Sequence, residues 1–255
     1  MGRIISRPGE MDKREATEEL IKALEVYEEL GFTFLPLKRD RIVNLIQSRP
    51  VYAVAESHED TISEPDHIMS RDNARALQEL REEIGECTRC NLHKERKNIV
   101  YGEGSSEARL MLIGEGPGRD EDIQARPFVG EAGKLLTRLI EKMGMKRENV
   151  YIANIVKCRP PYNRDPEENE IAACKPFVER QIEIINPKVI MSLGRVSAQS
   201  ILGMKMPISR MRGNFFSFHD IALMPTFHPA YLLRNPKDKW LVWDDAQKVL
   251  EKLKD

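Results

Sequence analysis

The chain has 255 residues, of which 41% are hydrophobic and 32% are charged, and its formal net charge is −1. This composition is typical of a soluble globular protein, and the length suffices for one α/β domain with an appendage. The near-zero charge excludes a global attraction to nucleic acid, so any contact with DNA has to use a local basic patch. We expect a cytoplasmic protein without membrane contact, because neither a membrane-spanning apolar run nor a signal peptide is recognisable.

The first 80 residues differ from the rest of the chain. Apolar residues at helical spacing predict a helix in "TEELIKALEVYEELG". Residues 48–70 are polar and lack periodicity, which indicates a flexible linker, and a second helix is expected over about 71–84. We therefore expect residues 1–80 to form a helical extension with a flexible linker, and residues 81–255 to form a separate domain. The extension either docks a replication or repair protein or covers a sheet edge.

Strand-like apolar runs alternate with helical patterns from about residue 86 onward. The expected strands are 108–114, 149–156, 187–194 and 221–227, and the expected helices are 132–144, 166–185, 195–202 and 237–254. Alternating strands and helices predict βαβ units, and therefore a three-layer α/β/α sandwich around a central, mainly parallel sheet.

Polar sequences follow three of these strands. "GEGPGRDED" comes after the first strand, Asn154 lies late in the second, and "HPAYLL" comes after the fourth. Because ligands of open α/β sheets bind beyond the carboxyl ends of the strands, these sequences predict one common site. Connecting loops are polar and rich in Gly and Pro in any case, so each sequence alone is weak evidence.

The first of these sequences contains several carboxylates. Glu115 and Gly116 directly follow the strand, and the missing side chain of Gly116 would let a planar ligand approach the backbone. Asp120, Glu121 and Asp122 could orient a water molecule or could cap the following helix. The two interpretations carry about equal weight.

Three further residues stand out, each with a structural alternative. Phe128 lies just before a predicted helix, and taken by itself it is better interpreted as core packing. Asn154 interrupts an apolar strand, and a buried amide has to find hydrogen-bond partners in the backbone or in a ligand. His228 lies beyond a strand end, where an imidazole could donate to an oxygen that gains negative charge, although most lone histidines are structural.

The four cysteines have the spacing C-x2-C-x67-C-x15-C, formed by Cys87, Cys90, Cys158 and Cys174. A C-x2-C pair turns both sulfurs toward one ion or cluster, and the other two thiolates complete the set. A structural zinc site and a [4Fe–4S] cluster both fit this spacing. Four unrelated buried thiols are the third alternative.

The ordered set "GEGPG", "RPFVGEAGKLL", "NIVKCRPP" and "HPAYLL", together with these cysteines, resembles the family 4 uracil-DNA glycosylases over about residues 80–253. That resemblance implies an enzyme that hydrolyses the N-glycosidic bond of uracil in DNA and leaves an abasic site. It also implies a [4Fe–4S] cluster held by the four cysteines, with zinc as the less favoured alternative. Relatives that become covalently bound to DNA carry a histidine-containing loop before the Phe motif, which "DEDIQARPFVG" lacks, so turnover is expected.

The resemblance also implies roles for single residues. Glu115 and Gly116 would line the uracil pocket and the water site, and Phe128 would stack on the flipped base. Asn154 would read the N3–H and O4 edge of uracil, and His228 would be the catalytic histidine.

The choice of the carboxylate that positions the attacking water stays open at this point. Glu115, Asp120 and Asp122 are the three candidates for placing the water or stabilising the sugar cation.

DNA contact is expected from basic sequences near the cysteines and near the last strands, with Arg159 and Arg212 as the candidates. Leu232 and Leu233 beside the histidine could wedge into the duplex or belong to the core. The expected partner is uracil-containing DNA, single- or double-stranded, bound by a monomer associated with the nucleoid.

Two other functions compete with this one. A non-catalytic iron–sulfur module that binds nucleic acid would use the cysteines alone. A nucleotide-binding α/β enzyme would use the Gly-rich turn for phosphate, but the missing G-K-[ST] sequence counts against it.

Overall fold

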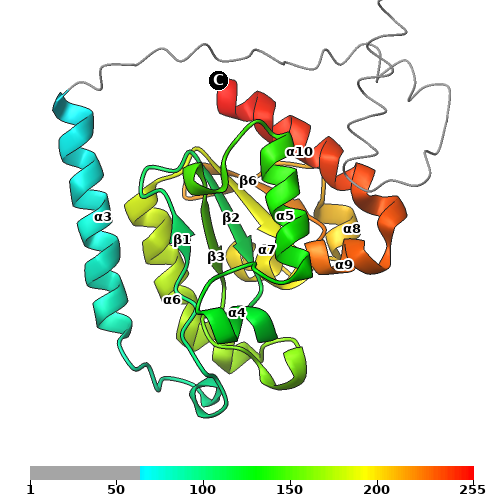
Figure 1. Ribbon diagram of the computed structural model, residues 1–255. Helices are drawn as coiled ribbons and strands as arrows, with labels where there is room; N and C mark the ends of the chain where they lie inside the picture. The colour runs from blue at the N-terminus through cyan, green and yellow to red at the C-terminus, as the bar shows by residue number, and fades with distance from the viewer. Residues whose placement is uncertain (1–63) are drawn as a thin grey trace, which may run out of the picture. The chain divides into compact units, whose positions relative to one another are not determined.

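The computed structural model describes residues 64–255, and Figure 1 shows their arrangement. Six strands form one sheet in the order β1-β3-β2-β4-β6-β5. The strands are β1 (Glu103–Gly104), β2 (Leu110–Gly114), β3 (Tyr151–Asn154), β4 (Val189–Leu193), β5 (Phe216–Phe218) and β6 (Ile221–Thr226). The four inner strands are parallel, whereas β1 and β5 pair antiparallel with β3 and β6 at the two edges.

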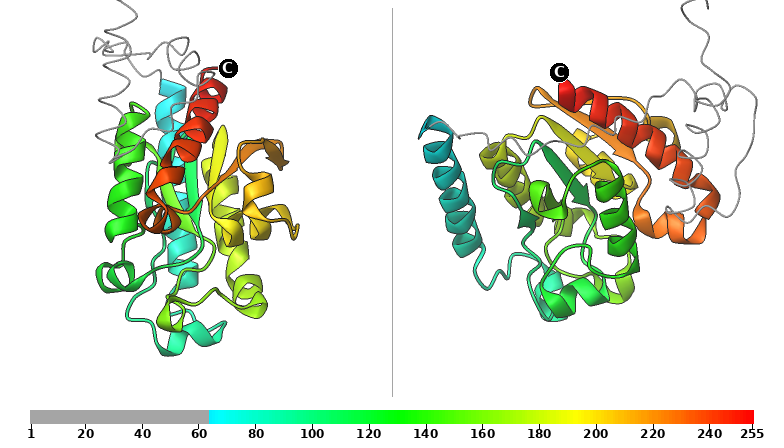
Figure 2. Two further views of the ribbon diagram at one scale, coloured as in Figure 1. Left: turned by 90° about the vertical axis from the view of Figure 1, so that its right-hand side faces the viewer. Right: turned by 45° about the horizontal axis from the view of Figure 1, so that its top comes forward.

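Helices cover both faces of this sheet. The α-helices are α3 (Glu64–Ile84), α4 (Arg119–Gln124), α5 (Glu131–Lys142), α6 (Glu168–Ile185), α7 (Arg195–Leu202), α8 (Ile208–Met211), α9 (Pro229–Arg234) and α10 (Lys239–Lys254). Four short 3-10 helices, η1 (Asn91–Lys94), η2 (Arg147–Asn149), η3 (Pro161–Asn163) and η4 (Pro236–Asp238), lie in the loops. Figure 2 shows the sheet between two helical layers. None of the described helices is long and apolar enough to cross a membrane.

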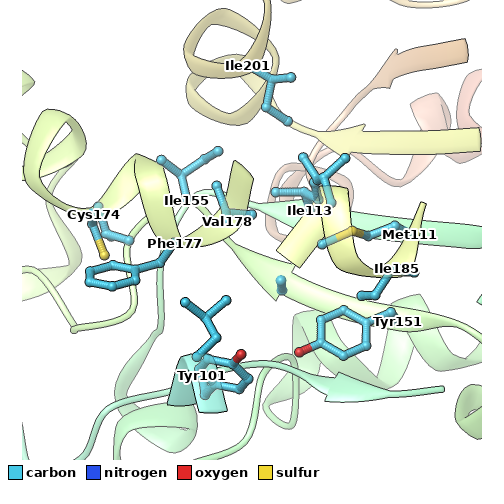
Figure 3. Close-up of a cluster of buried hydrophobic side chains, with 14 of the residues drawn as sticks. Tyr101, Met111, Ile113, Tyr151, Ile155, Cys174, Phe177, Val178, Ile185 and Ile201 are labelled. Carbon is cyan, nitrogen blue, oxygen red and sulfur yellow. The ribbon is translucent and has the colours of Figure 1, made fainter. Parts of the chain in front are cut away.

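The inner strands bury both of their faces, and this creates two cores. Along β2, Met111 and Ile113 join the core under α3, α6 and α7, whereas Leu110 and Leu112 join the core under α5 and α10. A strand in a covered parallel sheet therefore shows a continuous apolar run in place of alternation. Figure 3 shows the first core, to which β2 contributes Met111 and Ile113 and α6 contributes residues from Cys174 to Ile185.

The predicted α/β/α sandwich is confirmed, and each expected inner strand occurs within the predicted range. The edge strands β1 and β5 were missed. Each has at most three residues, and none of their residues is fully buried, so neither carries an apolar run that sequence analysis can detect.

The predicted start of the second helix was wrong. Helix α3 begins at Glu64, so residues 64–70 are helical and do not belong to a linker. Pro65 occupies the second helical position, where a missing N–H costs little, because the first N–H groups of a helix have no intrahelical acceptor. The predicted boundary between residues 80 and 81 falls inside this helix, and Leu80 is completely buried in the core with α6. The helix expected in residues 17–31 and any docking by the extension lie outside the described residues.

Candidate active site

A pocket of about 390 Å³ lies where the parallel strands β2 and β3 end and where β6 passes into α9. Its walls come from the segment after β2, from Phe128, from Asn154 at the end of β3, from the η3 loop and from the start of α9. The lining residues are Glu115, Gly116, Pro117, Gly118, Glu121, Phe128, Ala132, Asn154, Pro160, Asn163, Arg164, Asp165, His228, Ala230, Tyr231 and Arg234. The volume suits a small ring ligand rather than a macromolecule.

The centre of this pocket depends on the absent side chain of Gly114. Gly114 is paired with Asn154 in the parallel ladder of β2 and β3, so the two residues lie side by side. A Cβ atom on Gly114 would lie 2.4 Å from Oδ1 of Asn154 and 2.5 Å from Cζ of Phe128. Because neither approach is sterically possible, a glycine is required for Asn154 and Phe128 to share this space.

Asn154 is almost completely buried, with 1% of its surface exposed. Its Oδ1 atom is a buried acceptor without a hydrogen-bond partner in the described part of the chain. An unpaired buried amide oxygen costs about 1–3 kcal/mol, so a native structure keeps one where a ligand supplies the donor. Since Asn154 also lines the pocket, the missing donor is expected from the ligand.

Phe128 has an unusual backbone that places its ring in the pocket. Its φ of 50° lies in the left-handed region, which a bulky residue rarely adopts. Glu121 holds the following turn, because its Oε1 accepts hydrogen bonds from the N–H groups of Val129 and Gly130 at 2.9 Å each. A Cβ on Gly133 would lie 2.0 Å from the Phe128 carbonyl, so helix α5 packs directly under this turn.

His228 faces Phe128, with the two ring centroids 5.6 Å apart. Its Nδ1 accepts a hydrogen bond from the N–H of Ala230 at 3.1 Å, which caps helix α9. The residue as a whole is half-buried, but its imidazole is the enclosed part. Burial there, aided by the charge of Arg234, lowers the His228 pKa to about 4. The ring is therefore neutral near pH 7, and because Nδ1 is an acceptor, the ring hydrogen is on Nε2.

Only one of the three predicted carboxylates lines the pocket. Glu115 does so, and burial together with the negative charge of Asp165 raises its pKa to about 7, although Arg195 acts in the opposite direction. Asp120 is exposed at the start of α4. Asp122 is buried, and its Oδ1 accepts hydrogen bonds from the N–H groups of residues 97 and 98 at 2.9 and 3.1 Å. Asp122 therefore holds the loop at residues 97 and 98, and no side chain caps the start of α4, so the structure does not support the capping alternative for this acidic pair either.

Sequence analysis did not single out several lining residues. Glu121 was noted only as part of an acidic cluster, yet its carboxylate orders the Phe128 turn. Asn163, Arg164 and Asp165 line the pocket from the η3 loop. The only signal for them was their position in "RPPYNRDP", a loop sequence that begins one residue after Cys158.

The structure brings all four cysteines to one cavity. Cys87 and Cys90 follow α3, Cys158 follows β3, and Cys174 projects from α6 into the same space. Three of the sulfurs accept N–H donors: Sγ of Cys174 from the backbone of residue 157 at 3.2 Å, Sγ of Cys158 from Arg96 at 3.3 Å and Sγ of Cys87 from Arg89 at 3.4 Å. Donors of this kind stabilise sulfurs that carry negative charge.

Unless a cation is bound, the cysteine cavity favours the neutral thiol over the charged thiolate. Burial raises the pKa of Cys158 to about 11 and also raises the pKa values of Cys90 and Cys174. In the described residues, no three or more His, Cys, Asp or Glu side chains converge as the ligands of a single metal ion. In a four-iron cluster each cysteine sulfur would bind a different iron atom, so the four sulfurs need not converge on one point. They need only line the same cavity.

The four predicted DNA contacts differ in their environment. Arg212 forms a buried ion pair with Asp245 and donates to the carbonyl of Leu241 at 2.6 Å, so its guanidinium is already occupied. Leu232 is part of the core, whereas Leu233 is 43% exposed beside the pocket. Arg159 is half-buried and donates from Nε to Asn163 at 2.7 Å.

The candidate site of this α/β protein thus combines an amide with an unpaired oxygen, an aromatic ring and a neutral imidazole around a pocket at the strand ends. The family model of the uracil DNA glycosylase superfamily matches residues 101–253, which contain all of these groups. The chain belongs to this superfamily.

The relatives include a type-4 uracil-DNA glycosylase of Saccharolobus solfataricus, which is 50% identical over 68% of this chain and 85% of its own length. The type-4 uracil-DNA glycosylase of Thermotoga maritima is 48% identical over 66% of this chain and 90% of its own. A type-5 uracil-DNA glycosylase of Thermus thermophilus is more distant, with 30% identity over 40% of this chain and 53% of its own.

We expect Gly114→Ala to impair the pocket much more than the fold, because the new Cβ displaces Asn154 and Phe128 at the end of β2. The rate of uracil release by folded enzyme should fall by about a hundredfold or more, as misplacement of reacting groups by about 1 Å does. The control is Gly144→Ala, whose Cβ meets nothing within 4 Å although its φ of 76° makes the change unfavourable. Equal rates for the two folded variants would contradict the crowding argument.

Proposed function

We propose that this chain is a DNA repair hydrolase that cleaves the N-glycosidic bond of uracil in DNA, releases uracil and leaves an abasic site. The observation that carries the proposal is the buried Oδ1 of Asn154, which lacks a donor and faces a pocket for a small ring. Uracil supplies that donor at N3–H. Membership in the superfamily and the relatives of type 4 support the same reaction.

The uracil reaches this pocket only if it leaves the base stack, because enzymes that act on a base take it out of the duplex. Phe128 then offers a ring face for stacking, and Gly116 lines the pocket with its backbone, since a Cβ there would lie 2.7 Å from Cγ2 of Val156. Asn154 accepts from N3–H and donates from Nδ2 to O4. Cytosine has an acceptor at N3 and a donor at the neighbouring position, so it mismatches the same amide.

His228 stabilises the leaving group. When the C1′–N1 bond breaks, its electron pair goes to the uracil, and negative charge gathers on O2. The neutral imidazole donates its Nε2–H to this oxygen and does not need to give up the proton, since Nδ1 stays bonded to the Ala230 N–H. A low pKa suits this role because a neutral donor is available across the physiological pH range.

Glu115 serves the sugar side of the reaction. Its carboxylate orients a water molecule toward C1′ and takes the proton that this water loses as the new C1′–O bond forms. The same negative charge stabilises the positive character that develops on the sugar. Asp120 and Asp122 are not proposed for this step, because one is exposed and the other is bonded to backbone N–H groups.

Cys87, Cys90, Cys158 and Cys174 fit a [4Fe–4S] cluster, as judged by their common cavity and by the N–H donors to three of the sulfurs. When bound, the cluster would supply a covalent cross-link between the loop after α3, the loop after β3 and helix α6. The protein residues around it then hold the η3 loop, which lines the base pocket. A zinc ion is the alternative that metal analysis would distinguish.

DNA would be held by residues around the mouth of the pocket. Leu233 is the proposed wedge, since it is exposed and follows lining residues of α9. Arg159 is the proposed phosphate contact near the cysteine cavity. Arg212 and Leu232 are left out of this set because they are occupied in an ion pair and in the core.

The decisive test is uracil excision from a labelled oligonucleotide, followed by alkali cleavage, with a thymine-containing strand as control. His228→Ala should slow excision by about a hundredfold, because one lost donor to a developing oxyanion costs on the order of 3 kcal/mol. Asn154→Asp should slow it by roughly 10- to 150-fold, because a carboxylate cannot donate to O4. His219→Ala and Asn214→Asp, both at exposed positions, should retain the wild-type rate. If wild-type protein with its metal cleaves nothing, a non-catalytic binding module is the better account.

The pH dependence should separate the two titrating groups. The Glu115 pKa is raised to about 7, so the carboxylate form increases as the pH rises through that value, and the single-turnover rate should rise with it. The His228 pKa is lowered to about 4, so the neutral ring is lost only below that pH. Glu115→Gln should be slower and should lack the rising limb near pH 7. A rising limb that persists in this variant would remove Glu115 from the proton transfer.

Metal analysis tests the cluster. Protein purified without oxygen should contain about four irons and four sulfides per chain and should absorb near 400 nm. Cys158→Ser should lose most of both. His93→Ala is the neighbouring control, because Nδ1 of His93 lies 2.7 Å from the backbone carbonyl oxygen of Cys90 rather than from a sulfur, and this variant should keep the iron. If the protein instead contains a stoichiometric amount of zinc and no sulfide, the four cysteines form a zinc site and the proposed cluster is wrong.

A further inference from the structure

Tyr162 is the most exposed large hydrophobic residue in the described part of the chain, with 97% of its surface accessible. The other three such residues, Ile123, Phe215 and Leu233, are between 41% and 47% exposed. An aromatic side chain left in water gives up the stabilisation that burial provides, which is on the order of 2–3 kcal/mol. Its position on η3 therefore leaves the ring free for a contact outside this chain.

The backbone around Tyr162 is bent so that the ring points outward. Tyr162 has a φ of 55° and Asn163 a φ of 56°, so two successive residues other than glycine occupy the left-handed region. Such conformations are uncommon for a bulky side chain and cost about 1–3 kcal/mol each.

The η3 loop is held by several hydrogen bonds, so it is not a loose surface turn. Arg164 forms two hydrogen bonds, of 2.7 and 2.8 Å, with the buried carboxylate of Glu170 on α6. Arg159 donates to Asn163 at 2.7 Å across the turn. Cys158, which begins this stretch, lies in the cysteine cavity. The exposed ring is thus presented on a held backbone.

The loop also forms part of the wall of the base pocket. Pro160, Asn163 and Arg164 all line that pocket, so Tyr162 lies between lining residues while its own side chain is in solvent. A second exposed apolar side chain, Leu233, comes from α9, which lines the pocket from another segment. DNA that delivers a base into this pocket has to pass the same rim.

We infer that Tyr162 is a stacking platform for the nucleobase next to the flipped uracil in the same strand, and that it mainly serves the binding of single-stranded DNA. The inference rests on the proposed function, since it needs a nucleobase in the pocket. An aromatic face stacks on any base, so the contact carries no sequence preference. In a duplex, the neighbouring base keeps its pairing and its other stacking partner. In a single strand, flipping of the uracil exposes one face of the neighbouring base, and the protein has to supply a ring that stacks on this face.

The test compares wild type, Tyr162→Ala, Tyr162→Phe and the control Phe215→Ala, which removes another partly exposed aromatic ring. The ligand is an oligonucleotide with a 2′-fluoro-arabino deoxyuridine, whose glycosidic bond resists cleavage, next to 2-aminopurine. Dissociation constants are measured by anisotropy for the single strand and for the duplex. The fluorescence of 2-aminopurine in the saturated complex reports its stacking.

Tyr162→Ala should weaken single-strand binding by about 5- to 150-fold, the range found for one base–aromatic stack, and duplex binding by clearly less. The 2-aminopurine should be brighter in this complex than with wild type. Tyr162→Phe should stay within about twofold of wild type, because it keeps the ring face. Phe215→Ala should bind both ligands as wild type does, and all variants should keep the thermal midpoint and the absorbance near 400 nm.

Unchanged binding by Tyr162→Ala, or equal losses on both ligands, would overturn the inference. The two proposals fail in different ways. If wild type releases uracil and Tyr162→Ala binds normally, only the stacking inference is wrong. If wild type releases no uracil from either substrate, the proposed function itself is wrong.

Discussion

The site depends on the contact between the ends of two neighbouring parallel strands. β2 ends in a residue without a side chain, and β3 ends in an amide that occupies the space next to it. The Phe128 ring lies against the same space, and a Cβ atom on Gly114 would be only 2.5 Å from its Cζ atom. Because such an interior is close-packed, one backbone pairing fixes the positions of the Phe128 ring and the Asn154 amide relative to each other.

A buried network connects this contact to the cysteine cavity. Lys157 is fully buried, and its Nζ donates to the carbonyl of Asn154 at 2.9 Å and to Oε1 of Gln181 at 2.6 Å. Gln181 in turn donates to the carbonyl of Tyr101 and to the hydroxyl of Tyr151. The backbone N–H of the same lysine bonds to Sγ of Cys174. The end of β3 is therefore tied to the cysteines and to α6, which gives the cysteines a structural link to the pocket without any redox step.

Burial is the largest cause of both pKa shifts in the pocket, those of His228 and Glu115. Removing water disfavours the charged form of any group, so the pKa of the histidine falls while that of the glutamate rises. The neighbours then refine each shift, with Arg234 acting on His228 and Asp165 acting on Glu115. Partial burial beside the same pocket thus accounts for a neutral imidazole and for a carboxyl whose pKa lies near neutrality.

The sequence by itself determined the fold class, the inner strands and five of the residues that line the pocket, namely Glu115, Gly116, Phe128, Asn154 and His228. It could do so because buried parallel strands are continuous apolar runs, and because motifs at successive strand ends must lie at one edge of the sheet. Only the tertiary structure separated Glu115 from Asp120 and Asp122, because each carboxylate lies in the same acidic sequence and differs only in what surrounds it. The same holds for Leu232 and Leu233, which are adjacent in sequence but point to the core and to solvent. The ion pair of Arg212 with Asp245 likewise joins segments far apart in the chain, which no local pattern encodes.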